Sequence, residues 1–213
     1  MGDITQLINF AGNSIYFFQA LEALFGAFCV LVVWRRILQV RFPSDEAQGE
    51  FLTQVETSLS AGDFASASKL CEGDDRAVPA LITLAIAHRS LGIAKVRELV
   101  AERFQRDVLV DIEFRMTWVY AVIKSAPMLG LLGTVLGMMA AFGKLGSGEK
   151  VEASQLASDI SLALVTTFVG LTIAIPLSMC ATGLEIRLRR MQEQVAHGLT
   201  RFFEAFRATS SRN

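Results

Sequence analysis

Residues 125–142 read SAPMLGLLGTVLGMMAAF, and this stretch decides the fold of the chain. No charged residue lies between Lys124 and Lys144, so the stretch is long and apolar enough to cross a bilayer as a helix. It contains three glycines, a proline and one threonine. Small residues let neighbouring helices approach closely, and a polar group in hydrocarbon needs a hydrogen-bond partner. The stretch therefore predicts a membrane helix that packs tightly against other helices and presents a hydroxyl group to them.

The composition of the whole chain is also that of a membrane protein. Of its 213 residues 52% are hydrophobic and the mean hydropathy is +0.43, which is too apolar for an ordinary soluble domain. Three segments with almost no charge are long enough to span a bilayer: residues 15–34, 120–143 and 160–184. We predict an all-α, three-span integral membrane protein with long helices that extend into the cytoplasm and a small cytoplasmic helical domain.

The basic residues predict the orientation. Residues 35–124 hold twelve Lys and Arg and residues 187–213 hold six, whereas the first fourteen residues hold none. Because basic segments stay on the cytoplasmic side, each segment outside the spans can be assigned to one side of the membrane. These are a periplasmic N-terminus at 1–14, a cytoplasmic helical domain at 35–119, a periplasmic loop at 144–159 and a cytoplasmic C-terminal helix at 185–213. The first span lacks a basic leading region and an obvious cleavage site, which favours a retained anchor over a signal peptide.

Helical periodicity predicts the organisation outside the spans. Ser44 or Asp45 is suited to cap a first cytoplasmic helix. The predicted cytoplasmic helices cover residues 45–60, 64–70 and 78–90. Since no glycine or proline interrupts residues 93–126, one helix should run from the cytoplasm into the second span.

An apolar stripe continues beyond the third span. It consists of Leu188, Met191, Val195, Leu199, Phe202 and Phe206. A stripe at this spacing on a helix outside the bilayer has to be covered by other helices. We favour a surface for self-association between copies of the chain; packing against a similar stripe at residues 93–119 is a compatible alternative.

Small residues mark one face of each of the last two spans. Gly130, Thr134, Gly137 and Ala141 share a face of the second span, and Ala163, Thr167, Gly170 and Ala174 repeat the spacing on the third. One interpretation is close packing, with each threonine bonded to its own helix. The other is that the threonines line an ion-conducting path between the two helices. The spacing leaves both interpretations open.

The sequence carries no pattern typical of an enzyme. Gly-x-Ser-x-Gly, Walker and His-Glu-x-x-His motifs are absent, and His88 and His197 have no partner at metal-ligand spacing. The three cysteines are scattered and imply no disulfide framework. We therefore expect no enzyme activity, no cofactor and no metal site.

Two motifs resemble the signatures of the MotA/TolQ/ExbB family of proton-channel proteins. They are APMLGLLGTVLGM at residues 126–138 and ALVTTFVGLTIAIP at residues 163–176. The resemblance covers roughly residues 120–185. It implies a homopentamer around a central pore, which holds the membrane helices of a single-span partner resembling ExbD, TolR or MotB. With three spans and a compact cytoplasmic domain, the chain is most similar to the ExbB/TolQ side of the family.

By this resemblance, Thr134 and Thr167 take the places of the family's pore-facing threonines, with Thr166 adjacent. The resemblance assigns helix packing and pore architecture to Gly130, Gly133, Gly137 and Gly170, and local bends to Pro127 and Pro176. Neither residues 125–143 nor residues 160–184 contain an Asp, Glu, His, Lys or Arg side chain. Threonine hydroxyls do not store a proton near neutral pH. If this protein moves protons, another chain must therefore supply the carboxylate. In this family the partner's membrane aspartate fills that role.

Two carboxylates depart from the family pattern. ExbB and TolQ proteins commonly carry glutamate where this chain has Leu162. Asp159 could replace it at the outer mouth of the proton path; the alternative is that Asp159 is simply a carboxylate favoured by the helix dipole.

Glu22 lies inside the first span with Gln19 one turn before it, and a carboxylate within a membrane span suggests a functional role. Glu22 could pack in protonated form, contact the helix bundle or belong to a partner site. It lies only about 10 Å from the outer end of the span, which favours a group that is reached by water or protonated over a conducting group.

The predicted function is that of a proton-channel-forming stator subunit, which couples proton motive force to work on the cell envelope as ExbB does for TonB-dependent outer-membrane import. The alternatives are a TolQ-like subunit for envelope maintenance and division, or a non-conducting scaffold for a single-span partner. A TonB- or TolA-like protein is a further expected partner, and nucleic acid is not. The expected location is the bacterial inner membrane, with the N-terminus outside and the C-terminus in the cytoplasm.

Overall fold

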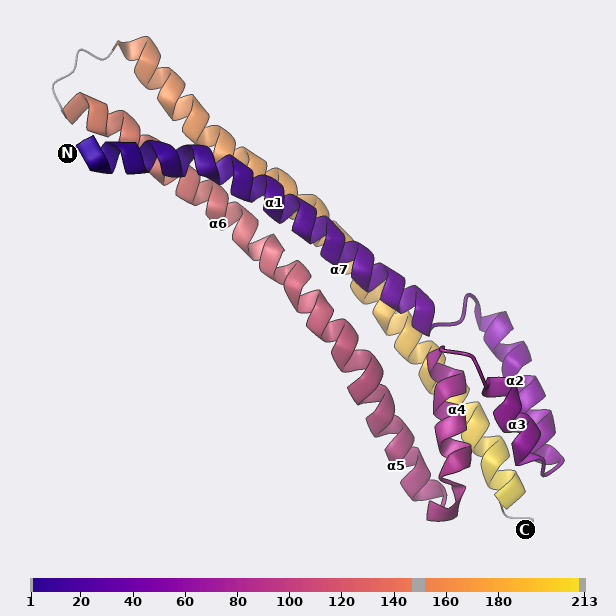
Figure 1. The fold of residues 1–213 in the computed structure, drawn as a ribbon. Helices are drawn as coiled ribbons and strands as arrows, with labels where there is room; N and C mark the ends of the chain where they lie inside the picture. The colour runs from indigo at the N-terminus through magenta and orange to yellow at the C-terminus, as the bar shows by residue number, and fades with distance from the viewer. Residues whose placement is uncertain (1, 147–151, 211–213) are drawn as a thin grey trace. The chain divides into compact units, whose positions relative to one another are not determined.

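The computed structural model describes residues 2–146 and 152–210, with side chains described from residue 14 to 146 and from 152 to 209. Every regular element in these residues is helical (Figure 1). The elements are α1 (Gly2–Val40), α2 (Asp45–Ser60), α3 (Phe64–Cys71), α4 (Ala77–Ala87), the 3₁₀ helix η1 (Arg89–Leu91), α5 (Ile93–Phe104), the π-helical segment η2 (Gln105–Leu109), α6 (Val110–Gly146) and α7 (Ala153–Ser210).

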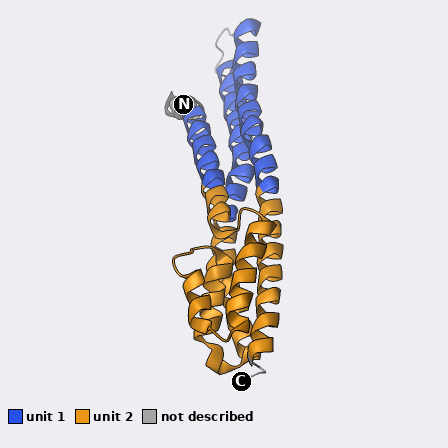
Figure 2. Ribbon diagram, turned by 90° about the vertical axis from the view of Figure 1, so that its right-hand side faces the viewer, with its two compact units in different colours: residues 1–31, 116–183 blue, residues 32–115, 184–213 orange. Residues whose placement is uncertain are grey.

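Three stretches of the described chain are helical, long and apolar enough to cross a membrane. They lie within Ser14–Ser60, Ile93–Gly146 and Ala153–Thr209 and contain the predicted spans at 15–34, 120–143 and 160–184. The prediction of an all-α chain with three membrane-crossing helices is confirmed. The chain divides into two compact units: unit 1 comprises residues 1–31 and 116–183, and unit 2 comprises residues 32–115 and 184–213 (Figure 2).

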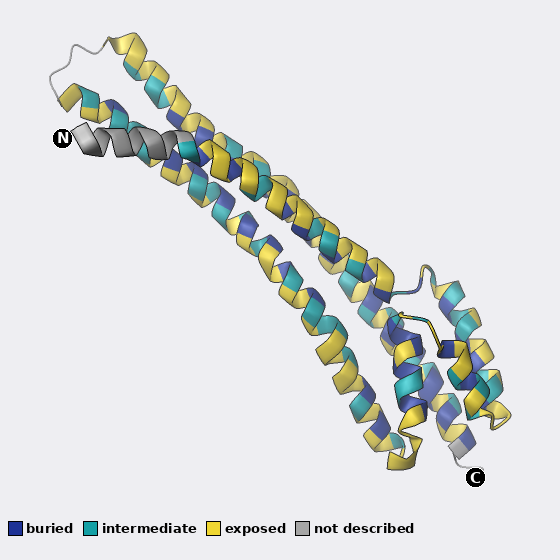
Figure 3. Ribbon diagram, viewed as in Figure 1, coloured by how far each residue is buried: buried dark blue, intermediate teal, exposed yellow. Residues whose placement is uncertain are grey.

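Unit 1 buries small side chains where its helices meet and exposes many of its large ones. Its fully buried residues include Ala126, Ala141 and Ala163, whereas Met128 and Phe168 are 68% and 69% exposed. Exposed residues recur along all three of its helices (Figure 3). A soluble bundle would bury its large apolar side chains. Close helix contact through small residues, with bulky residues turned outward, is typical of helices that pack within a bilayer.

Unit 2 is a helical bundle with a conventional apolar core. Ser44 caps α2, because its Oγ accepts a hydrogen bond from the Ala47 backbone N–H at 3.1 Å. Asp63 caps α3 in the same way through the N–H of Ser66 at 2.9 Å. Between these helices Gly62 has a φ of +75°, a conformation that favours glycine. The predicted helix at 45–60 is therefore confirmed together with its cap.

The apolar stripe after the third span is covered by the chain itself. Phe202 and Phe206 are buried in unit 2, where the rings of Phe206 and Phe64 meet at a centroid distance of 6.0 Å. Thr209 Oγ1 donates to the Leu59 backbone oxygen at 3.0 Å. The interpretation of this stripe as a free self-association surface is wrong for the described residues, because α2 and α3 fold back onto α7 and cover it. The alternative of packing within the chain applies, with helices before residue 93 among the partners.

The long helix before the second span differs from its prediction in one detail. It extends over residues 93–146 as expected, but η2 interrupts its α-helical hydrogen bonding. The upstream helix also ends at Ala87, before the predicted Ser90, and η1 follows. A π-helical turn has no residue signature comparable to proline or glycine, so helical periodicity does not predict it.

Candidate functional site

Glycines bring α6 and α7 into close contact in unit 1. A Cβ atom on Gly130 would lie 2.7 Å from the Thr166 carbonyl oxygen and 2.8 Å from the Thr167 Cα atom. A Cβ atom on Gly137 would lie 2.6 Å from the Cβ atom of Ala163. Because backbone atoms cannot move aside as side chains do, alanine at Gly130 requires a shift of the helices.

Gly133 and Gly170 lie at the same contact. A Cβ atom on Gly133 would lie 2.7 Å from the Cβ atom of Thr166. A Cβ atom on Gly170 would lie 3.1 Å from the carbonyl carbon of Ala126 and 3.3 Å from the Cα atom of Pro127. The structure thus places all four glycines singled out from the sequence between α6 and α7.

Thr166 is enclosed by this contact. It is 4% exposed, and its Oγ1 lies 2.9 Å from the Gly130 carbonyl oxygen and 2.7 Å from the Ala163 carbonyl oxygen. A hydroxyl group has one proton to donate, so the two carbonyl groups share it. Thr166 therefore fills the space that Gly133 leaves and bonds α7 to α6.

Thr134 and Thr167 form a hydroxyl pair across the two helices. Their Oγ1 atoms are hydrogen-bonded to each other, and Thr134 Oγ1 also lies 3.2 Å from the carbonyl oxygens of Gly130 and Ala163. Both threonines are only half-buried, unlike Thr166. A cavity of about 540 Å³ reaches Thr134 and is lined further by Val135, Met138, Met139, Phe142 and Gly143. Of Thr134, Thr166 and Thr167, Thr134 is thus the residue that lines this open space.

Asp159 lies in an ion pair. Its Oδ2 atom is 2.6 Å from the Nζ atom of Lys144, and both side chains are half-exposed. Thr167 follows Asp159 by eight residues, which is about 12 Å along the axis of α7. Leu162, at the position where a family glutamate was expected, is 58% exposed. The structure therefore brings Asp159 to the end of α6 and not into contact with the threonine pair.

The two prolines lie inside continuous helices. Pro127 is an interior residue of α6 and Pro176 of α7. Because proline has no N–H group, the carbonyl groups of Ile123 and Thr172, four residues earlier, lose their helical donor. Neither helix ends at its proline, and the local bends remain a prediction.

One face of α1 presents polar side chains to the other helices of unit 1. Tyr16, Gln19 and Glu22 are spaced three residues apart and so share this face. The Tyr16 hydroxyl group donates to the Leu162 carbonyl oxygen at 3.1 Å. The Gln19 Nε2 atom donates to the Thr166 carbonyl oxygen at 2.7 Å. The first span is therefore tied to α7 beside the threonine cluster.

Glu22 completes this polar face toward α6. Its Oε1 atom accepts a hydrogen bond from the Ser125 Oγ atom. The sequence singled out Glu22, but the partnership with Ser125 was missed, as was the bond of Gln19 to α7. The regular spacing of Tyr16, Gln19 and Glu22 in an otherwise apolar span was the signal that could have predicted a polar helix face.

The threonine pair has a limited chemistry. Hydroxyl groups donate and accept hydrogen bonds, so Thr134 and Thr167 are able to pass a proton along through water but not to hold one near neutral pH. Within residues 14–146 and 152–209, no group of three His, Cys, Asp or Glu side chains is placed to bind a metal ion. A proton path along this pair requires a carboxylate from outside it.

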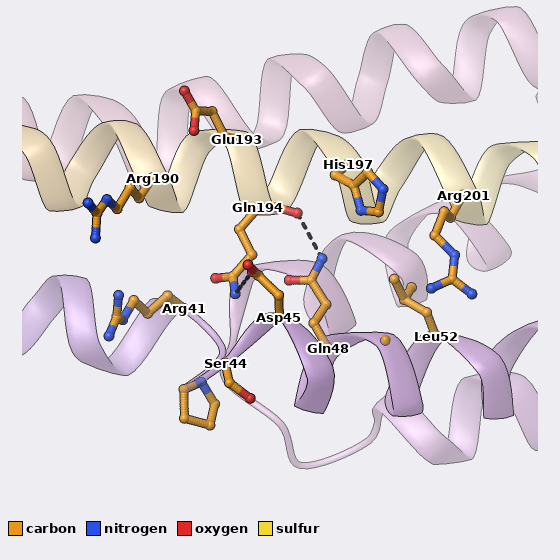
Figure 4. Close-up of a pocket in the computed structure, with 12 residues that line it drawn as sticks. Arg41, Ser44, Asp45, Gln48, Leu52, Arg190, Glu193, Gln194, His197 and Arg201 are labelled. Atoms are coloured by element: carbon orange, nitrogen blue, oxygen red, sulfur yellow. Dashed lines mark hydrogen bonds between the residues drawn. The ribbon is translucent and has the colours of Figure 1, made fainter.

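A second cavity, of about 670 Å³, lies in unit 2 between α7 and the beginning of α2 (Figure 4). Gln194 Nε2 donates to Asp45 Oδ1 at 2.8 Å, and Gln48 Nε2 donates to the Gln194 carbonyl oxygen at 2.8 Å. Arg201 also binds the carboxylate of Glu56, at 2.8 Å. These bonds join α2 to α7, and we assign the cavity to the architecture of unit 2.

Comparison with known proteins gives a family and several relatives. The model of the MotA/TolQ/ExbB proton channel family matches residues 80–197, which include the α6–α7 contact and exclude α1. A biopolymer transport protein ExbB of Helicobacter pylori is 40% identical over 67 residues, which are 32% of this chain and 46% of that protein. A Tol-Pal system protein TolQ of Haemophilus influenzae is 30% identical over 92 residues, which are 43% of this chain and 40% of that protein.

A longer match extends over most of the chain. A putative biopolymer transport protein ExbB homolog of Methanothermobacter thermautotrophicus is 28% identical over 192 residues, which are 83% of this chain and 66% of that protein. The chain spans about half the length of the ExbB and TolQ relatives named before it.

Proposed function

This chain belongs to the MotA/TolQ/ExbB proton channel family, and we propose that it is a channel-forming stator subunit that couples proton motive force to work on the cell envelope. The observation that carries the proposal is the Thr134–Thr167 hydroxyl pair, half-buried between two closely packed membrane helices. Proton flow past this pair would move a partner relative to the ring of subunits, and the partner would transmit the work.

The proposed assembly is a homopentamer around the membrane helices of a single-span partner that resembles ExbD or TolR. The partner's membrane aspartate would hold the proton, which the threonine pair cannot do. Large apolar side chains exposed on unit 1, such as Phe168 and Met128, support contact with lipid and with other chains. Asp159 would lie near the outer mouth of the path, in its ion pair with Lys144.

The proposed location is the inner membrane, with the N-terminus and residues 144–159 outside and the C-terminus in the cytoplasm. The distribution of basic residues supports this orientation. For the cellular role we propose an ExbB-like energising of TonB-dependent import. Because a TolQ relative also matches, a TolQ-like role in envelope maintenance is the second candidate, and the identity of the partner distinguishes the two.

Removal of both hydroxyl groups tests the channel. The double variant Thr134→Val and Thr167→Val, reconstituted in liposomes with the partner, should lower proton flux by about tenfold or more, measured with a pH-sensitive dye under an imposed gradient. Thr172→Val is the matched control, because Thr172 is exposed and donates only to its own helix at Phe168. It should leave the flux unchanged.

The same experiment separates the channel from a scaffold. If the double variant assembles with the partner and conducts as well as the control, the threonine pair has no conducting role. The bond of Thr134 to Gly130 within α6 would then be simple packing. A wild-type complex that assembles but carries no proton flux would instead make the chain a non-conducting scaffold.

A further inference from the structure

Two buried oxygen atoms on α1 have no hydrogen-bond donor among the side chains and backbone groups of residues 14–146 and 152–209. They are Gln19 Oε1 and Glu22 Oε2. Gln19 is fully buried, at 0% exposure, and its Nε2 atom already donates to Thr166. Both residues lie outside the family match, which begins at residue 80, so their role does not follow from membership of the family.

Leaving these atoms without a donor is costly. A buried acceptor without a hydrogen bond lowers the stability of the folded protein, and an unpaired carboxylate in an apolar region lowers it much more. The other carboxylate oxygen of Glu22, Oε1, accepts a hydrogen bond from the neutral hydroxyl group of Ser125. Lys124, the charged residue next to Ser125 in sequence, is exposed. The contacts of Glu22 therefore provide no positive charge to balance a carboxylate.

A single proton shared by the two oxygen atoms would satisfy both. Gln19 and Glu22 are three residues apart on one helix, a spacing that brings side chains together. A proton on Glu22 Oε2 turns that atom into a donor, and the amide oxygen of Gln19 is the acceptor one turn away. We propose that Gln19, Glu22 and Ser125 form a proton-binding site, in which Glu22 is a neutral carboxylic acid that donates to Gln19 and accepts from Ser125.

This site fastens α1 to the other helices of unit 1 and does not continue the path along the threonine pair. Its link to the threonines runs from Gln19 to the Thr166 carbonyl oxygen, and Thr166 in turn donates to the Gly130 carbonyl oxygen. Backbone carbonyl groups accept hydrogen bonds but have no proton to pass on. Glu22 is therefore a positioning residue, and the inference rests on the membrane setting of unit 1 and not on proton flux.

Infrared spectroscopy of the full chain in lipid tests the proton directly. The wild-type protein should show the carbonyl-stretch band of a protonated carboxylic acid at neutral pH, and Glu22→Gln should remove it. Gln19→Leu and Ser125→Ala should each shift the band, since each takes away one hydrogen bond to the acid. Glu46→Gln, a change at an exposed glutamate of α2, is the matched control and should leave the band unchanged.

Several outcomes would overturn the inference. Absence of the band, or its persistence in Glu22→Gln, shows that Glu22 does not hold a proton. A band that disappears when sodium replaces choline in the buffer assigns the two oxygen atoms to a cation. In the flux assay, loss of conduction in Glu22→Gln with correct assembly would make Glu22 a conducting group. The infrared results do not depend on the outcome for Thr134 and Thr167.

Discussion

At the residue scale, the neighbouring threonines Thr166 and Thr167 on α7 differ in burial. This difference assigns helix packing to Thr166 and proton transport to Thr167. Thr166 is enclosed and bonded to backbone carbonyl groups of both helices, whereas Thr167 is half-buried and paired with Thr134. We expect Thr166→Val to lower the free energy of unfolding by about 1 kcal/mol and to leave proton flux near that of wild type. Thr167→Val should lower proton flux and leave the free energy of unfolding near that of wild type. Thermal unfolding in detergent and dye-monitored flux in liposomes measure the two effects, and a loss of flux in Thr166→Val at unchanged stability would contradict this division.

At the scale of the element, the fit between α6 and α7 depends on glycine at the contact. Gly130→Ala forces a Cβ atom against the backbone of α7, so we expect a loss of about 1–3 kcal/mol in the free energy of unfolding. Gly143 lies on the same helix with no atom within 4 Å of the corresponding Cβ position. Gly143→Ala should therefore be neutral or stabilising, by up to about 1 kcal/mol. Equal melting temperatures for the two variants would show that close approach at Gly130 does not stabilise the pair of helices.

At the scale of the whole molecule, the orientation in the membrane is open to a labelling experiment. Burial raises the pKa of the Cys71 thiol to about 11, so little reactive thiolate forms there at neutral pH. To exclude any labelling of native thiols, Cys29, Cys71 and Cys180 are all replaced by serine. In this background Ser154→Cys should react with a membrane-impermeant maleimide added to intact cells. Glu46→Cys should react only after the membrane is permeabilised. The opposite result would reverse the orientation that the basic residues predict.

Much of the architecture follows from the sequence because it depends on local properties. The absence of charge over residues 160–184 predicts a span without any knowledge of its neighbours. Capping by Ser44 is equally local, since the cap and its donor lie three residues apart. The faces that hold Gly130 and Thr167 follow from the 3.6-residue period of a helix. The π-helical turn at Gln105–Leu109 and the burial of Phe206 by α2 and α3 did not follow, because neither is visible in the periodicity of one segment.

The sequence by itself determined three membrane-crossing helices and a small-residue face with a threonine on two of them, because hydropathy and helical periodicity act along the chain. Only the tertiary structure decided that Thr134 meets Thr167, that Thr166 is enclosed and that Glu22 meets Ser125. Glu22 and Ser125 are 103 residues apart in the chain, and Gln19 and Thr166 are 147 residues apart. Such contacts depend on the rotation and depth of each helix relative to the next. Those two quantities are set by side-chain packing across helices and leave no mark in the periodicity of either helix alone.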